Sequence, residues 1–192
     1  MQVDVLSDKE LIGQYLAGEE SALECLISRH KDKVFTSILF IVKDHALAED
    51  VFQDTFIKVI DTLRSGKYKE EGKFLPWVTR IGYNLCIDHF RRLKRAPTVT
   101  TSEGFDLFNL LDFADGNAEE DVIMDQTRTR VRHLIDHLPE EQREVVILRH
   151  YSELSFKEIA EMTNVSINTA LGRMRYALIN MRKLIAEKNM TL

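Results

Sequence analysis

The chain has 192 residues, a net charge of -5 and a hydrophobic content of 44%, which is enough for one ordinary domain or two small ones and excludes disorder as a whole. No stretch approaches the roughly 18 uninterrupted apolar residues of a membrane helix, and the start, MQVDVLSDKE, lacks the basic and apolar regions of a secretory signal. We therefore expect a cytoplasmic protein.

The spacing of apolar residues is helical throughout, and no alternation of period two persists, so the predicted fold class is all-α. Ser7 with Glu10 and Ser155 with Glu158 have the spacing of a capping box, which marks a helix start. The predicted helices span residues 7–17, 20–42, 45–65, 73–95, 119–137, 140–150, 156–162 and 167–187.

The two cysteines, Cys25 and Cys86, each stand among apolar neighbours. Two buried free thiols are therefore expected rather than a disulfide. They supply no metal site, and we predict neither a metal nor a cofactor.

Residues 97–118, PTVTTSEGFDLFNLLDFADGNA, lose the helical pattern and predict a linker between a domain at 1–96 and a domain at 119–192. All of the negative excess lies here, because residues 97–126 hold 8 acids and no base. The linker also contains the apolar residues Phe105, Leu107, Phe108, Leu110, Leu111 and Phe113. These are too many for a solvated tether, and packing on its own domains and docking on a partner remain the two alternatives.

Residues 155–187 have the plan of a helix-turn-helix, with a tight turn at 163–165 and Ser166 placed to cap the second helix. We expect the first helix to bury Phe156, Ile159, Ala160 and Met162, and the second to bury Ile167, Ala170, Leu171, Met174, Leu178, Met181 and Ile185. The opposite face of the second helix would then expose Asn168, Thr169, Gly172, Arg173, Tyr176 and Asn180, with Arg175 on its flank.

In a recognition helix the N-terminal part meets base edges in the major groove, where Arg and Asn bond guanine and adenine. Asn168, Thr169 and Arg173 are the leading candidates for base reading, and Gly172 would allow close approach to the DNA. The alternative is an ordinary amphipathic helix with a solvated basic face. The late cations Arg182, Lys183 and Lys188 fit that alternative better, since cations near a helix C-terminus favour its dipole.

The helix at 73–95 is expected to bury Phe74, Trp77, Val78, Ile81 and Leu85. A second stripe consists of Arg80, Asn84, Ile87, Asp88, Arg91 and Arg95, with Arg92 and Lys94 as further cations. Such a mixture of hydrogen-bonding groups and cations suits the reading of one DNA strand beside its phosphates. A solvated face with an ion pair from Asp88 to Arg91 or Arg92 is the alternative.

Three motifs carry a resemblance to a known family. The string AEDVFQDTFIK at 48–58 resembles the polymerase-binding helix of extracytoplasmic-function (ECF) sigma factors, and FLPWVTRIGYNLCIDHFRR at 74–92 is similar to their -10 element helix. Leu138-Pro139 and the helix-turn-helix resemble their -35 reading domain. The resemblance covers nearly the whole chain in the right order.

The resemblance implies a non-catalytic subunit that directs core RNA polymerase to promoters, with an anti-sigma factor as a further partner. The clamp of the largest polymerase subunit would face Asp50, Gln53, Asp54, Phe56 and Lys58. The -10 strand would lie along Asn84, Asp88 and Arg91, and its phosphates would meet Arg80, Arg91, Arg92 and Lys94. The loop 65–73 would capture a flipped base, and the acidic linker would thread toward the polymerase active site.

The sequence departs from the family at two places. Arg80 and Ile81 stand where primary sigma factors have a tryptophan pair, which implies stricter demands on promoter sequence. In the recognition helix, Asn168, Leu171 and Tyr176 replace glycine, lysine and arginine, so the preferred -35 sequence is open.

Two other classes of protein compete with this interpretation. A conventional helix-turn-helix regulator would bind operators as a dimer without polymerase. An enzyme would use Asp50 and Asp54, or Asp88 and His89, as acid/base groups or metal ligands, although no His or Cys joins the first pair.

Overall fold

The computed structural model describes residues 6–95 and 130–187, and these residues form helices joined by turns and loops, with no strand among them. The all-α prediction is confirmed. The chain divides into two compact units. The predicted linker 97–118 and the predicted domain boundaries lie outside the described residues.

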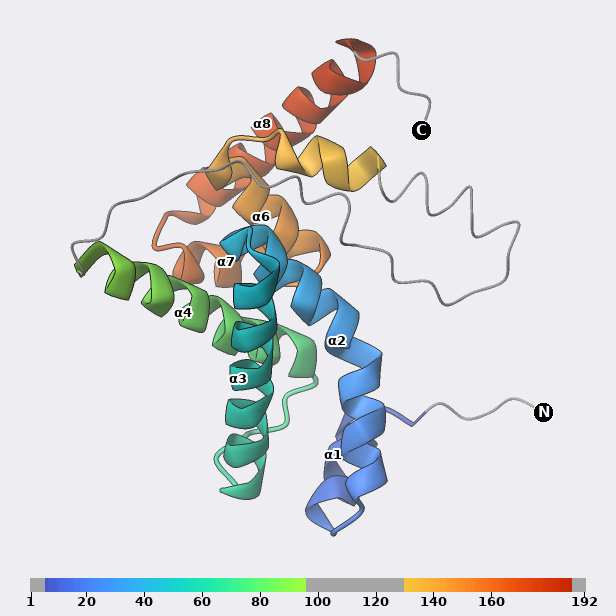
Figure 1. Cartoon of the computed structure of the whole chain (residues 1–192). Helices are drawn as coiled ribbons and strands as arrows, with labels where there is room; N and C mark the ends of the chain where they lie inside the picture. The colour runs from blue at the N-terminus through green and yellow to red at the C-terminus, as the bar shows by residue number, and fades with distance from the viewer. Residues whose placement is uncertain (1–5, 96–129, 188–192) are drawn as a thin grey trace, which may run out of the picture. The chain divides into compact units, whose positions relative to one another are not determined.

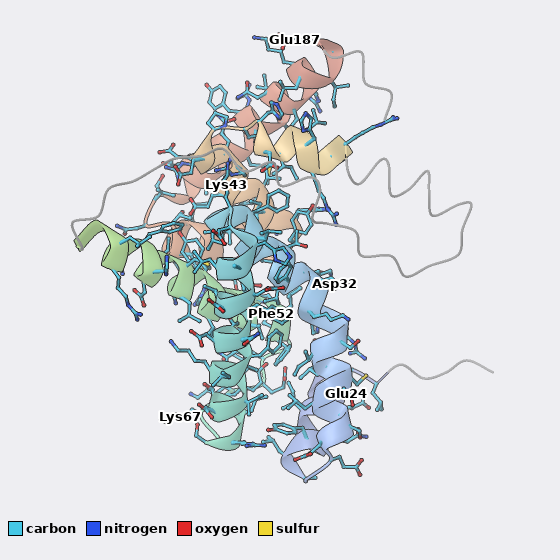
Figure 2. The ribbon with its side chains drawn as sticks, viewed as in Figure 1. Glu24, Asp32, Lys43, Phe52, Lys67 and Glu187 are labelled. Atoms are coloured by element: carbon cyan, nitrogen blue, oxygen red, sulfur yellow. The ribbon has the colours of Figure 1, made fainter. Side chains whose placement is uncertain are left out.

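The first unit contains α1 (Asp8–Leu16), α2 (Glu20–Val42), α3 (His45–Arg64) and α4 (Phe74–Arg95) (Figure 1). The predicted capping box of α1 is present, because the Ser7 backbone N–H donates to the Glu10 carboxylate at 2.8 Å while the Ser7 hydroxyl accepts from the Glu10 N–H. α2 ends at Lys43 (labelled in Figure 2), whose φ of 56° is left-handed. Asp44 then caps α3 by accepting from the Leu47 N–H at 2.9 Å.

Helix α2 is the centre of this unit: α1, α3 and α4 pack against it, and α3 also packs against α4. The core contains Leu26, Val34, Ile38, Val59, Leu63, Phe74 and Val78. At Gly82 an added Cβ would come within 3.2 Å of both the Ile38 Cδ1 and the Thr55 Oγ1. Glycine at this position therefore lets α4 cross α2 and α3 at close range.

The second unit contains a helical segment over 130–136, then α6 (Glu140–His150), α7 (Phe156–Met162) and α8 (Ile167–Glu187). α8 packs against α6 and α7, and the core includes Leu134, Ile135, Leu138, Val145, Leu148 and Ile159. The capping box of Ser155 and Glu158 opens α7, as predicted. The turn between α7 and α8 contains Asn164 with a left-handed φ of 55°.

The helices agree with their predicted bounds to within one residue, except that the helix predicted at 119–137 can be compared only from residue 130 onward. The prediction for Cys25 is wrong: Cys25 is exposed, because it lies on the outer side of α2, whereas Cys86 is buried as expected. Both are free thiols.

Candidate polymerase and nucleic-acid interface

Helix α3 presents an acidic face to solvent. Asp50, Gln53, Asp54 and Lys58 are all exposed, as their predicted role requires. Phe56 is not available on this face, because it is only 6% exposed and its ring packs 4.8 Å from that of Phe52.

Phe52 lies on the side of α3 that faces α2 (labelled in Figure 2), where its ring also meets Phe35 at 5.7 Å. The apolar group that the acidic face does expose is Ile57, at 56%. Ile57 follows Asp54 by three residues and Asp50 by seven, so the three side chains lie on the same face of the helix. The sequence prediction missed Ile57, although helical spacing from Asp50 could have found it.

Helix α4 presents a polar and basic stripe. Its predicted members Arg80, Asn84, Asp88, Arg91 and Arg92 are exposed. The ion pair weighed as the alternative is also present, since an Arg91 guanidinium nitrogen lies 3.4 Å from the Asp88 carboxylate.

This ion pair is long and both its side chains are more than half exposed, so it is weak and easily exchanged for another partner. On the opposite face Phe74 and Val78 are buried, while Trp77, Ile81 and Leu85 are only half-buried. The side chains of Lys94 and Arg95 lie outside the described part of the chain.

The loop between α3 and α4 is anchored at Tyr68. Its ring lies 4.4 Å from that of Trp77 and 6.2 Å from that of Phe74. The Tyr68 hydroxyl donates to Glu70 at 3.1 Å, and the Gly72 N–H donates to the other oxygen of the same carboxylate at 2.6 Å. Burial and the nearby Glu70 charge raise the Tyr68 pKa, so the phenol stays a neutral hydrogen-bond donor. These contacts of Tyr68 and Glu70 therefore fix the conformation of the middle of the loop 65–73, which was predicted to capture a base.

The buried face of α8 differs from the predicted one. Ala170 is fully buried as predicted, and so is Ala177, which was not predicted, whereas Leu171 and Leu178 are 44% and 46% exposed. Ile167 is also exposed. Leu171 and Leu178 each follow a buried alanine by one residue, so they lie about 100° further round the helix, beside the contact.

The rotation of α8 changes the position of Arg173, a predicted base-reading residue, and of Asn180, which was predicted on the same outward face. Arg173 is only 18% exposed and forms an ion pair with Glu141 of α6 at 3.2 Å. The Asn180 side chain donates to Gln142 of α6 at 2.8 Å. Both residues therefore hold α8 on α6, and the prediction that they belong to the outward face is wrong.

The remaining predicted DNA-facing residues do lie outward: Asn168, Thr169, Arg175 and Tyr176 are exposed, and Gly172 is half-exposed. The Thr169 N–H donates to the Ser166 hydroxyl at 3.0 Å, and the two hydroxyls lie 2.8 Å apart. Ser166 is therefore the cap of α8, as predicted, and Thr169 is partly engaged in that cap.

Across the described ranges, no group of three or more His, Cys, Asp or Glu side chains is placed to hold a metal ion. Likewise, none of the helices described is long and apolar enough to cross a membrane. Asp50 and Asp54, which were weighed as acid/base groups, are both exposed on α3.

A helix-turn-helix together with a helix that exposes a basic stripe is typical of a DNA-binding protein. The family description Sigma-70 region 2 matches residues 26–96, and Sigma-70, region 4 matches residues 128–175. These two matches together cover more than half of the chain. The chain belongs to the sigma-70 family, as an RNA polymerase sigma factor of the ECF group. The regulator alternative is not favoured, because it leaves the region 2 match unexplained.

Curated relatives resemble the chain over most of its length. The ECF RNA polymerase sigma factor SigW of Bacillus subtilis is 28% identical over 184 residues, which cover 93% of this chain and 97% of SigW. The RNA polymerase sigma factor CarQ of Myxococcus xanthus is 29% identical over 173 residues, which cover 88% and 92% of the two chains.

Two solved structures share the fold. CnrH, solved with the cytosolic domain of CnrY, is 21% identical with a TM-score of 0.58, covering 94% of this chain and 97% of that one. RpoE of Bartonella quintana, solved with the anti-sigma factor NepR, is 17% identical with a TM-score of 0.58, covering 85% and 96%.

Proposed function

We propose that the chain directs core RNA polymerase to specific promoters through three helix faces, each with its own partner: α3 binds the polymerase clamp, α4 binds the -10 strand and α8 binds the -35 duplex. The observation that carries this proposal is the exposed stripe on α4, which lies within the region 2 match. Its amide, carboxylate and guanidinium groups suit the reading of one DNA strand beside its phosphates.

On α4, Asn84 and Asp88 offer hydrogen bonds to base edges, while Arg80, Arg91 and Arg92 offer charge to phosphates. Lys94 belongs to the same proposal from its sequence position alone. Because the Asp88–Arg91 pair is weak, binding a strand here does not require a strong internal contact to break.

On α8, we assign base contacts to Asn168 and phosphate or base contacts to Arg175 and Tyr176, with Thr169 at the edge of the surface. Gly172 allows the helix to approach the DNA closely. Arg173 supports this surface indirectly, because its ion pair with Glu141 holds α8 against α6. On α3, Ile57 takes the apolar role first assigned to Phe56, among Asp50, Gln53, Asp54 and Lys58.

The proposal includes a non-catalytic role and a cytoplasmic location, where bacterial polymerase meets its DNA. An anti-sigma factor is a further proposed partner. Its support is that CnrH and RpoE, which share this fold, were solved with the cytosolic domain of CnrY and with NepR.

The α4 assignment is tested by salt dependence of open-complex formation with core polymerase. Removing one phosphate contact from a single strand lowers the slope of log affinity against log salt by about 0.7. We expect this for Arg91→Ala and not for Lys31→Ala, which removes an exposed cation from α2. Equal slopes for the two variants would remove Arg91 from the DNA surface.

A further inference from the structure

Gly172 lies inside α8, where glycine destabilises a helix relative to alanine. A Cβ built at Gly172 meets no atom within 4 Å, in contrast to Gly82, whose Cβ would press on Ile38 and Thr55. Packing within the protein therefore explains Gly82 and does not explain Gly172. The half-exposed space beside Gly172 is open to a partner.

Leu171, the next residue, stands where two surfaces of α8 meet. On one side lies the exposed apolar flank formed by Ile167, Leu171 and Leu178. On the other side lie Asn168 and Arg175, which are three residues before and four residues after Leu171 and so are its neighbours on the helix surface. An exposed leucine is thus placed directly between an amide and a guanidinium group.

These groups match one base pair of DNA in particular. In the major groove an A·T pair displays the adenine N6 and N7 atoms, which an Asn side chain bonds, beside the thymine C5-methyl group, which apolar side chains contact. A G·C pair has no such methyl group. The described part of α8 therefore offers an amide for adenine and an apolar group for thymine within one turn.

We infer that Leu171 is a specificity-determining residue that reads a thymine C5-methyl group in the -35 element, and that Gly172 allows the helix to approach closely enough for this contact. The inference rests on the proposed -35 role of α8 and names the base that it selects. Asn168 would then bond an adenine in the same or the adjacent pair.

The test uses holoenzyme assembled from the full chain and core polymerase. Its DNA is a duplex that contains a promoter identified by run-off transcription. Each -35 thymidine is replaced in turn by deoxyuridine, which lacks only the C5-methyl group. At one position we expect a roughly fourfold loss of affinity, the value for one buried methylene-sized group. No loss at any position, or a -35 element without an A·T pair, would overturn the inference.

Two leucine variants separate a specific contact from general loss of apolar surface. In Leu171→Ala the uracil penalty should vanish, because the side chain that contacts the methyl group is gone. In Leu178→Ala, which truncates an equally exposed leucine two turns further along α8, the penalty should persist. A penalty that survives Leu171→Ala would assign the methyl contact to another residue.

Two glycine variants test the close approach. Gly172→Ala and Gly13→Ala both replace a helical glycine with open space around it, so both should raise the melting temperature. Only Gly172→Ala should lose promoter affinity, and equal affinity of the two variants would contradict the inference. If scrambling the whole -35 element changes nothing, the proposed role of α8 fails; if scrambling weakens binding but uracil does not, only the methyl contact fails.

Discussion

Truncation of Ile57 gives a quantitative test of the α3 surface. This side chain is 56% exposed in the free protein, so about half of its area remains to be buried by a partner. Full burial of an isoleucine side chain contributes about 1.5–3 kcal/mol, and half of that is about 0.8–1.5 kcal/mol. Ile57→Ala should therefore weaken binding to core polymerase by roughly four- to thirteenfold.

The matched control is Leu16→Ala, since Leu16 is 55% exposed on α1 and lies outside the proposed surface. Competition of each variant with fluorescently labelled wild-type chain for core polymerase measures the affinity. Neither variant should change the melting temperature appreciably, because surface substitutions usually alter stability by less than about 0.5 kcal/mol. Equal affinities for Ile57→Ala and Leu16→Ala would refute the assignment of α3.

Three further predictions concern the fold. Ser155→Ala removes the capping box of α7 and should destabilise that helix by about 1 kcal/mol. Amide hydrogen exchange should become roughly fivefold faster in α7 but not in α1, and Ser7→Ala should have the reverse effect. Unchanged exchange in both variants would contradict the role of the capping boxes. The buried Thr79 hydroxyl has no hydrogen-bond partner among the described residues, so Thr79→Val should stabilise the protein by about 1 kcal/mol, and a lower melting temperature would show that the hydroxyl is paired. Burial raises the pKa of Cys86 to about 12, so a thiol reagent at pH 8 should modify the exposed Cys25 quickly and Cys86 only after unfolding; two fast thiols in the native protein would contradict this.

The helices could be predicted because their signals are local. The hydroxyl and carboxylate of a capping box lie three residues apart, so Ser7 and Ser155 mark their helix starts without any tertiary information. The exposed stripe on α4 was also predictable, since polar groups from Arg80 to Arg91 keep helical spacing.

The orientation of α8 could not be predicted in the same way. This helix has apolar residues over a wide arc, and the sequence alone does not show which part of the arc meets α6 and α7. Leu171 and Leu178 were predicted on the buried face together with Ala170, but the fully buried residues are Ala170 and Ala177, and both leucines are exposed. That rotation is why Arg173 became an internal ion-pair partner.

Phe56 and Cys25 show the same limit. In an amphipathic helix a residue at the edge of the apolar face becomes buried or exposed according to its neighbours across the contact. Phe56 is buried against Phe52, and Ile57, the next residue, takes the surface. Cys25 stands among apolar residues in the sequence, yet helical rotation puts it on the outside of α2.

The most direct test of the central claim is run-off transcription from genomic DNA fragments with purified core polymerase, with and without the chain. We expect discrete transcripts that appear only when the chain is added, with start sites that share upstream -10 and -35 sequences. The absence of such transcripts at every salt concentration, together with specific duplex binding by the chain alone, would contradict the assignment of these helix faces to promoter recognition by holoenzyme.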